Sequence, residues 1–526
     1  VMLAGMWERA LQLDAESDIT HVLLDPADVD GDGEWAVYYY EGWGGEQPRR
    51  YASFQEFMEA MYRQFHSLTA HRRGAAFDNA TTRTLDATIE EARLEALRGQ
   101  YERAGTMLAE AETYGRPRAT GLRDQIRRLL GQTYMVYFGH LTADPLYAPE
   151  VLPVLAAEQV RHHQHDDSTW AFHLRGAPDA VRKAGDEILR QVREGTFRYT
   201  AGGPFGQAVD EAREQARWGD TDPAWHTLRA ALPTWQPLGP DQLAPLGLLA
   251  DPLLGPLLTP QLGRELLATP RGSRMGDVPA PAADLDPPGM AWLTETDPGN
   301  FLVAYRFVLV EGVDPAELPA RIGADGTAEL HEPMLLWEAH TRLRSNGEVS
   351  TWDDRALAAV GRAGPGWSFA FEPRPGQHFN EQRFISPAQA ASHGTRAVVV
   401  WSEPARGHGE HGLFHLSVAE DGQEKYAFTV HGTTIRRSGT IPVTLDPDRF
   451  IPQTPDEPVS GRLGERRALE AIAAEFQVRL PRFALTHGRL HTFTTRSWTR
   501  PPDPGETYTV IRFGPLGNGG QGPSAP

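Results

Sequence analysis

The chain has 526 residues, enough for about three or four domains at about 150 residues per domain. Its formal net charge of −19 disfavours nucleic acid and anionic membranes as partners. It has no cysteine, which excludes disulfide frameworks, thiolate metal sites and cysteine nucleophiles. The 52 Gly and 42 Pro residues indicate many turns and linkers, whereas the 40% of hydrophobic residues argues against general disorder.

The sequence contains no recognisable targeting signal. Residues 1–6 lack a basic stretch followed by a long apolar run, so a secretory leader is not expected. The apolar stretch at 244–258 is interrupted by Pro245, Pro252 and Pro256 and is too short for a bilayer-spanning helix. We therefore expect a cytoplasmic location and no membrane partner.

The first seventy residues predict a small α/β unit. Strands are expected at 20–24, ending in the turn Asp25-Pro26, and at 35–40 after a Gly/Asp cluster. Ser53 and Glu56 form a capping-box pattern at the start of a helix. Apolar residues recur behind the cap with helical spacing and predict a face that packs into the core. They are Phe54, Phe57, Met58, Met61 and Phe65.

This region resembles the C-terminal half of SUKH domains (Smi/Knr-like). The shared cues are Leu24-Asp25-Pro26, an acidic turn, an aromatic strand and Tyr51-Ala52-Ser53-Phe54-Gln55-Glu56-Phe57. The resemblance covers residues 20–65 and implies a mixed α/β binding module without enzymatic activity, of the kind found in cell-wall-synthesis regulators and bacterial immunity proteins. No counterpart of the usual opening helix is recognisable, so we expect a partial domain.

The acidic turn has two interpretations. Asp28, Asp30 and Asp32 occupy positions 1, 3 and 5 of an EF-hand-like loop, with Gly33 at position 6. However, Tyr39 stands where a bidentate Glu is required, and a strand follows in place of a helix. A solvated hairpin turn is therefore favoured over a calcium site.

The middle of the chain predicts helices from residue 84 to about 130 and from 178 to 232. A shift of 120 residues aligns residues 91–111 with 211–231, and eight positions are then identical, most of them Ala, Gly or Leu. Small residues allow helices to pack closely, and glycine permits the bend between them. The spacing resembles one tetratricopeptide helix pair, seen twice. Packing without common ancestry explains the pattern equally well.

Three polar clusters deserve comparison with metal or partner sites. The groups His162–Asp167 and His408–His415 contain histidines and carboxylates, but their spacing or their glycine-rich context disfavours a metal site. Solvated segments are the favoured interpretation of both. A group of arginines is interpreted as a solvated helix face, with an acidic partner as the alternative. It consists of Arg116, Arg118, Arg123, Arg127 and Arg128.

A Pro-rich linker at 270–288 precedes a β-rich half. Strands are expected at 301–310, 367–372, 396–401, 413–418, 425–431 and 433–437, with a hairpin at Glu420-Asp421-Gly422 and short helices beginning at Asp314 and Ser386. This order predicts one sheet with helices against one face. The polar stretch at 331–354 is expected to be a surface excursion, and residues 461–479 an amphipathic helix.

Residues 292–450 resemble an uncharacterised bacterial domain family, through cues such as Arg321-Ile322-Gly323 and the segment 366–372. No activity accompanies that resemblance. The predicted fold is thus multi-domain α+β, with a partial SUKH-like unit, an all-α middle of tetratricopeptide-like helical hairpins and an α+β C-terminal domain with a mainly antiparallel sheet. The expected boundaries are 1–70, 71–269, the linker 270–288, 289–455, a helix and terminal strands at 456–513, and a disordered tail at 514–526.

Sequence motifs for nucleotide binding, serine hydrolases and zinc proteases are absent. No catalytic, cofactor-binding or metal-binding residue is assigned. The leading hypothesis is a non-enzymatic cytoplasmic module, immunity-like or regulatory, that binds a protein partner such as a basic toxin. A scaffold that uses the helical hairpins is the alternative, and an enzyme of unrecognised type is the third.

Overall fold

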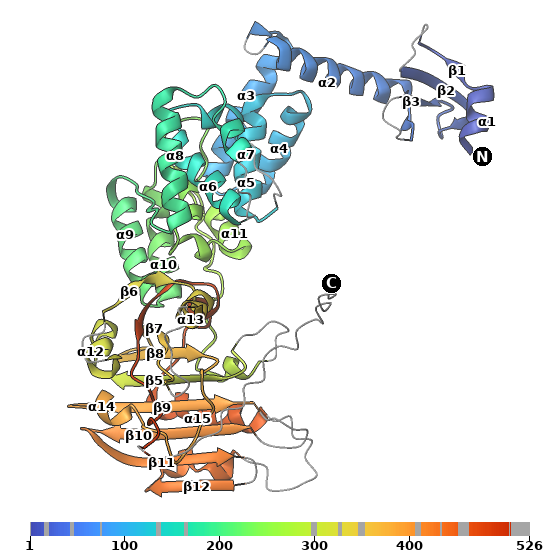
Figure 1. Cartoon of the computed structure of the whole chain (residues 1–526). Helices are drawn as coiled ribbons and strands as arrows, with labels where there is room; N and C mark the ends of the chain where they lie inside the picture. Colours follow the sequence, from blue (N-terminus) through green and yellow to red (C-terminus); the bar gives the residue numbers. More distant parts are fainter. Residues whose placement is uncertain are drawn as a thin grey trace, which may run out of the picture. The chain divides into compact units, whose positions relative to one another are not determined.

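The computed structural model describes residues 2–14, 20–42, 47–73, 76–132, 138–161, 167–295, 302–324, 329–345, 353–404, 412–431, 434–450, 462–503 and 505. The chain divides into two compact units, whose helices and strands are labelled in Figure 1. Unit 1 comprises residues 1–196, 232–250 and 258–281, and unit 2 comprises 197–231, 251–257 and 282–526. The architecture has a small N-terminal sheet, a helical middle and a C-terminal antiparallel sheet.

Unit 1 begins with a four-stranded antiparallel sheet, in the order β1-β2-β3-β4 within the described residues. Its elements are helix α1 Met2–Arg9 and strands β1 Leu11–Gln12, β2 Thr20–Val29, β3 Trp35–Glu41 and β4 Arg49–Tyr51. The sequence did not predict α1, although a helix does open this unit. The expected turn at Asp25-Pro26 was also wrong, because β2 continues through it with an irregular register between Asp25 and Val29.

The N-terminal sheet is covered on both faces. On one side the guanidinium of Arg9 donates to both carboxylate oxygens of the buried Asp25, at 2.7 and 2.6 Å. On the other side the ring of Phe57 lies against Tyr39 and Tyr51, with ring centroids 6.1 and 5.6 Å away. These contacts make the sheet, α1 and the start of the following helix one packed element of unit 1.

Helix α2, Phe54–Arg73, begins as the capping pattern predicts. The Glu56 amide donates to Ser53 Oγ at 3.0 Å, and the Glu56 carboxylate accepts from the Ala52 amide at 2.6 Å. The expectation that its apolar face is core was wrong for most of its residues. Phe57 is buried, but Phe54 is 43% exposed and Phe65 is 56% exposed. The periodicity correctly predicted a helix, but it did not predict which side of that helix is covered by the rest of the chain.

Helices follow α2 as far as residue 268. Those in unit 1 are α3 Ala80–Leu97, α4 Tyr101–Thr113, α5 Pro117–Leu129, α6 Ala148–Arg161, α7 Asp167–His173, α8 Asp179–Glu194 and α11 Pro260–Ala268. Unit 2 holds α9 Gly203–Arg217 and α10 Thr221–Ala231. No helix among the described residues is long and apolar enough to span a membrane.

The aligned repeat forms two equivalent helix pairs, α3–α4 and α9–α10. Gly99 and Gly219 both have positive φ, 96° and 86°, at the bend between their helices. Such backbone angles are accessible to glycine at little cost. Ala92, Ala104 and their partners 120 residues later are fully buried. The two pairs belong to different units, whereas one helical domain was expected.

The segment at 270–288 contains no helix or strand, but parts of it are anchored within each unit. Arg271 is fully buried in unit 1, where its side chain donates to backbone carbonyls such as that of Thr269, at 3.0 Å. Asp286 is buried in unit 2, where its carboxylate accepts from the Phe483 amide at 2.6 Å. The Pro-rich linker predicted here is therefore packed into the folded units at these two positions.

The C-terminal part of unit 2 is built on a nine-stranded antiparallel sheet of described residues, in the order β12-β11-β10-β9-β5-β8-β7-β13-β6. Its strands are β5 Tyr305–Glu311, β6 His331–Met334, β7 Leu357–Arg362, β8 Trp367–Pro373, β9 Arg396–Glu403, β10 Leu413–Glu420, β11 Gln423–His431, β12 Thr434–Gly439 and β13 Leu490–Thr494. Its helices are α12 Leu318–Ile322, α13 Leu336–Ser345, α14 Ala388–Ala391, α15 Leu463–Phe476 and α16 Arg482–Thr486.

Both faces of this sheet are covered, so the expectation of helices on one face was wrong. Alternate residues of β5 supply two separate clusters: Phe307 packs with Leu469 of α15, and Val308 packs with Leu318 of α12. The hairpin between β10 and β11 is confirmed, and Asp421 and Gly422 have positive φ of 46° and 77°, as a two-residue hairpin turn requires.

Several elements differ from the prediction. Strands β7 and β13 were not expected, and the strand expected near 508–513 lies outside the described residues. The polar stretch at 331–354 contains β6 and α13, and its last residue, Asp354, is buried. It is therefore part of the folded unit and not a surface excursion.

Candidate functional site

The acidic turn between β2 and β3 forms an exposed patch, here called the turn patch. Asp30 Oδ1 accepts from the amides of Asp32 and Glu34, each at 2.9 Å, which fixes the turn. All three acidic residues are exposed. They are flanked by Val29 and Trp35, which are 46% and 39% exposed. The turn patch therefore combines carboxylates with an aromatic and an aliphatic side chain that face solvent.

The turn does not form an EF-hand-like site. Asp28, the expected first ligand, accepts from Arg50 Nε and Nη2 at 2.6 and 2.8 Å and from the Tyr38 hydroxyl at 2.7 Å. These hydrogen bonds, that of Arg50 above all, lower the pKa of Asp28 to about 2. Within the described part of the chain, no cluster of three His, Asp or Glu residues could hold a metal ion. The solvated-turn interpretation fits this geometry.

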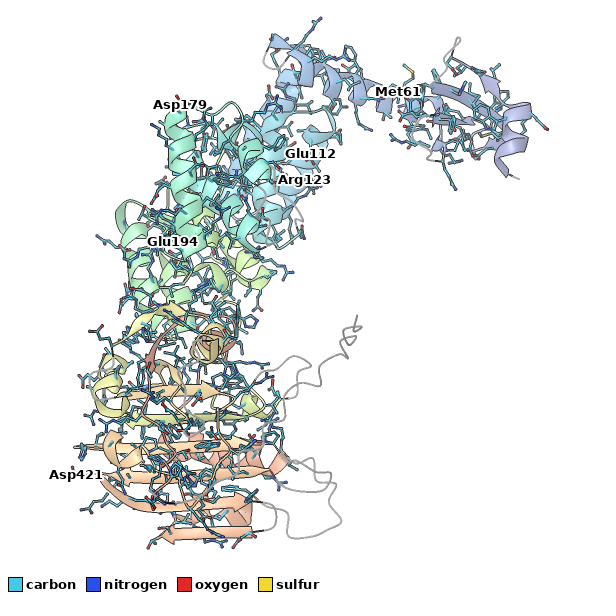
Figure 2. The ribbon with its side chains drawn as sticks, in the orientation of Figure 1. Met61, Glu112, Arg123, Asp179, Glu194 and Asp421 are labelled. Atoms are coloured by element: carbon cyan, nitrogen blue, oxygen red, sulfur yellow. The ribbon has the colours of Figure 1, made fainter. Side chains whose placement is uncertain are left out.

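The five arginines of α5 and its N-terminal flank do not form a solvated face. Each has a carboxylate partner within unit 1, and Figure 2 labels one pair, Arg123 and Glu112. The others are Arg116 with Asp86 at 2.7 Å, Arg118 with Asp241 at 2.5 Å, Arg127 with Asp124 at 3.4 Å, and Arg128 with Glu158. Four of these pairs join α5 or its flank to other segments of unit 1, the Arg127–Asp124 pair lies within α5, and an acidic partner is not needed to explain the group.

The histidine clusters are only partly described. The side chains of 162–167 and the residues 405–411 lie outside the described part of the chain. His415 is described and is buried, with Nδ1 2.8 Å from the hydroxyl of Thr429 and its ring against Phe379 and Phe384. Burial lowers the pKa of His415 to about 3. This imidazole is a neutral core side chain.

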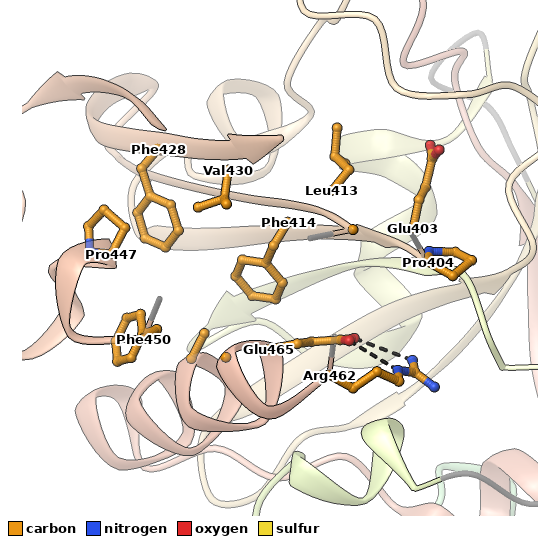
Figure 3. A pocket seen from close by; sticks show the side chains of 13 residues that line it. Glu403, Pro404, Leu413, Phe414, Phe428, Val430, Pro447, Phe450, Arg462 and Glu465 are labelled. Atoms are coloured by element: carbon orange, nitrogen blue, oxygen red, sulfur yellow. Dashed lines mark hydrogen bonds and ion pairs between the residues drawn. The ribbon is translucent and has the colours of Figure 1, made fainter. Parts of the chain in front are cut away.

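A pocket of about 210 Å³ lies in unit 2 beside the strands β9, β10 and β11 and the start of α15 (Figure 3). Its walls are largely apolar. The hydrophobic lining residues are Pro404, Leu413, Phe414, Phe428, Val430, Pro447, Phe450 and Ala468. A recess of this composition suits an apolar group.

The polar end of the pocket is dominated by Glu465. Its Oε1 accepts from the hydroxyl of Tyr305 at 2.5 Å and that of Ser402 at 2.8 Å, and Oε2 accepts from Arg462 Nε at 3.1 Å. Burial and the neighbouring carboxylate raise the pKa of Tyr305. With both oxygens already accepting hydrogen bonds, Glu465 ties α15 to β5 and β9.

Neither the turn patch nor the pocket was predicted as a site. The acidic turn itself could be recognised in the sequence, but the exposure of the Trp35 side chain depends on how β3 packs. Glu465 of the pocket accepts a hydrogen bond from Tyr305 across 160 positions of sequence, so no local motif could have indicated its setting.

Residues 288–453 match the model of a family of unknown function (DUF6461). The match covers about a third of the chain and ends before α15, so Arg462 and Glu465 lie outside it. No significant match to a curated protein or to a solved structure was found. The comparisons therefore assign no activity to the turn patch or to the pocket.

Proposed function

We propose that the chain is a cytoplasmic, non-enzymatic protein-binding module whose SUKH-like N-terminal unit recognises a basic protein partner, such as a toxin. The observation that carries this proposal is the turn patch, with Trp35 exposed beside Asp30, Asp32 and Glu34. Exposed tryptophans are frequent anchors of protein interfaces because they bury a large area with few rotatable bonds.

The distribution of charge supports a basic partner. The first seventy residues contain thirteen acidic and four basic side chains, a net charge of −9 out of −19 for the whole chain. About half of the negative charge is thus concentrated in about an eighth of the sequence. A field of this kind accelerates encounter with a positively charged protein, and its effect weakens as salt is added.

A pull-down from the host lysate tests the proposal. The variant combines Trp35→Ala with Asp30→Asn and Asp32→Asn; an asparagine at position 30 keeps the oxygen that accepts from the turn amides. We expect wild type to retain one dominant basic partner that elutes with salt, and the variant to lose at least about 90% of it.

The matched control is Trp337→Ala, which removes a 53% exposed tryptophan from α13, outside the N-terminal unit. The control should retain the partner. Equal recovery with wild type and the turn-patch variant would refute the proposed function, as would a partner whose binding does not depend on salt.

The scaffold hypothesis rests on the two helix pairs. Their equivalent glycines and buried alanines support a shared tetratricopeptide-like design. A scaffold predicts several weak partners that survive loss of the turn patch. The same pull-down therefore separates the two functions, because only the scaffold retains its partners in the triple variant.

A further inference from the structure

The recess beside β10, β11 and the start of α15 is cut into the hydrophobic core of unit 2, and its volume is about 210 Å³. Phe414, Phe428 and Phe450 line it and also belong to the core cluster on that face of the sheet, each at most 7% exposed. Protein interiors are packed as densely as organic crystals, and few of their voids exceed a water molecule. Empty space of this volume forfeits packing contacts that a bound molecule would restore.

Helix α15 leaves this space open because the residues that it contributes to the lining are small at this point. Gly464 and Ala468 lie one turn apart and both line the recess, whereas Ile472 follows one turn later in the core. A Cβ atom at Gly464 would lie 2.7 Å from the carbonyl oxygen of Phe450, so no side chain fits at this position. Ala468 is 2% exposed, and a longer side chain there would extend into the recess.

The recess has an apolar end and a polar end. Figure 3 shows Phe428, Pro447 and Phe450 toward one end and the Arg462–Glu465 pair toward the other. An apolar cavity of about 150 Å³ holds one benzene molecule. By that proportion the recess accommodates about eight to ten non-hydrogen atoms, which is one aromatic ring with a short polar substituent. An aromatic ring suits the apolar end, because phenylalanine rings pack against it both edge to face and in offset stacks.

The polar end offers a hydrogen-bond donor. Arg462 Nε donates to Glu465 Oε2 at 3.1 Å, and Arg462 Nη2 donates to the Val303 carbonyl at 3.3 Å. Within the described part of the chain, Arg462 Nη1 has no hydrogen-bond partner. Its N–H groups can therefore donate to an oxygen atom of a ligand.

The charges at this end favour a ligand without a net charge. Arg462 and Glu465 form an ion pair and balance each other. Glu403, the second carboxylate of the lining, accepts from the Phe379 amide at 2.6 Å and from Trp401 Nε1 at 3.0 Å. A ligand carboxylate would add negative charge beside Glu465, and a ligand ammonium would compete with Arg462 for the same carboxylate. A neutral oxygen meets neither obstacle.

We propose that the recess binds a small neutral molecule composed of one aromatic ring and one ketone or hydroxyl group. The ring lies among Phe414, Phe428 and Phe450, and the oxygen accepts a hydrogen bond from Arg462 Nη1. The site lies in unit 2 and uses none of the residues of the turn patch, so it is a binding activity beyond the proposed function.

Saturation-transfer NMR with the full chain tests the class of ligand. The probes acetophenone, benzoate and benzamidine have the same number of non-hydrogen atoms and differ mainly in charge. We expect a Kd of about 0.1–1 mM for acetophenone and binding at least about tenfold weaker for the two charged probes. Octan-2-one, a ketone of the same size without a ring, should also bind more weakly than acetophenone. Equal or tighter binding of a charged probe would overturn the neutral class, and that of octan-2-one would overturn the aromatic class.

Filling the recess locates the binding site. Ala468→Leu should weaken acetophenone binding by at least about tenfold, because the new side chain occupies the space of the ring. A thermal unfolding midpoint equal to or above that of wild type would show that the variant is folded. Ala474→Leu adds the same side chain at an exposed position of α15 outside the recess and should bind acetophenone as wild type does. Undiminished binding by Ala468→Leu, or no binding by wild type, would overturn the proposal.

The hydrogen bond is tested with Arg462→Met, which keeps a long apolar side chain but removes the donor. It should weaken acetophenone binding by at least about fivefold and leave that of ethylbenzene, which has no oxygen, unchanged. The matched control is Arg466→Met, which removes a guanidinium paired with Glu470 at 3.0 Å on the same helix and should change neither. Unchanged acetophenone binding in Arg462→Met, or equal loss of both probes, would overturn the assigned role of Arg462. The turn-patch variant should bind acetophenone as wild type does, so failure of this site and failure of the proposed function are distinguishable.

Discussion

A fully buried arginine in each unit illustrates two ways of placing a cation inside a protein. In unit 2, the Arg306 guanidinium lies against the rings of both Trp401 and Trp498, 4.8 and 4.4 Å from their centroids. It also donates to Asp354 at 2.7 Å and to Glu372. In unit 1, Arg271 instead donates to the carbonyls of Leu243, Leu266, Leu267 and Thr269.

The pKa values of the two side chains shift in opposite directions. Burial alone lowers the pKa of Arg271, because the carbonyls at the end of α11 offer partial charges only. For Arg306, the carboxylates of Glu372 and Asp354 outweigh burial and raise the pKa. Full counter-charges hold a buried cation more strongly than partial charges do, but the cation and its carboxylates then depend on one another. Loss of one carboxylate beside Arg306 should therefore cost more unfolding free energy than loss of Arg271, which is bound by carbonyls.

The largest effect is expected for Asp354→Asn. Asp354 Oδ1 also accepts from the amides of Trp498 and Thr499, at 2.8 and 3.2 Å, so this carboxylate organises the segment after β13. The variant should lose about 3–5 kcal/mol of unfolding free energy, because a buried cation keeps only one counter-charge. Urea unfolding measures the loss. Asp353→Asn, which removes a carboxylate paired with the exposed Arg355, should change stability by less than about 1 kcal/mol.

Arg271→Met should destabilise unit 1 by about 2 kcal/mol. The variant leaves buried carbonyls without donors, but it also removes a charge that has no carboxylate partner. Hydrogen exchange of peptides from α3 and α11 reports the change in unit 1 specifically. Arg264→Met, at an exposed position of α11, should have little effect. A loss from Arg271→Met greater than that from Asp354→Asn would contradict the comparison between the two arginines.

The buried charges also mark the limit of prediction from sequence. The β10–β11 hairpin was predictable because its signal, Asp421-Gly422 between alternating strands, is local. The Arg306–Asp354 pair spans 48 positions, and Asp354 ended a polar stretch that resembled a surface loop. Arg306 and Asp354 come together only through the tertiary structure, which places β5 beside β8 and Asp354 beside the segment after β13.

Helix α2 shows the complementary limit. Its cap and periodicity predicted the helix correctly from local residues. The same periodicity could not tell whether Phe65 packs inside the chain or faces outward. An apolar helix face is expected to be covered, but its spacing does not show which part of the structure covers it. The turn patch depended on tertiary structure for the same reason, since exposure of Trp35 is not encoded by its neighbours in sequence.

His415 extends the comparison to a buried base that stays neutral. Its pKa of about 3 lies below the ordinary value of 6.5. As the pH falls, the imidazole of His415 is therefore protonated at a higher pH in the unfolded chain than in the native chain. Stability should therefore fall by about 2 kcal/mol between pH 7.5 and pH 5 on account of this residue. His415→Leu should abolish that part of the pH dependence, as measured by urea unfolding at both pH values. An unchanged pH dependence would mean that His415 can be protonated in the native state.

Asp286 should act in the opposite direction and with the smallest effect. Burial raises its pKa to about 6, above the ordinary value of 3.8, so the native state binds the proton more tightly than the unfolded state. The resulting stability is complete below pH 3.8 and is lost as the pH rises through 6.

Asp286→Asn removes the buried charge but keeps an oxygen for the Phe483 amide. Because an amide accepts that hydrogen bond more weakly than a carboxylate, the net gain at pH 8 should be about 1 kcal/mol, with little gain at pH 4.5. Urea unfolding of unit 2 at the two pH values measures it, and a loss of stability at pH 8 would show that the charged carboxylate is stabilised by its amide donor more than burial destabilises it.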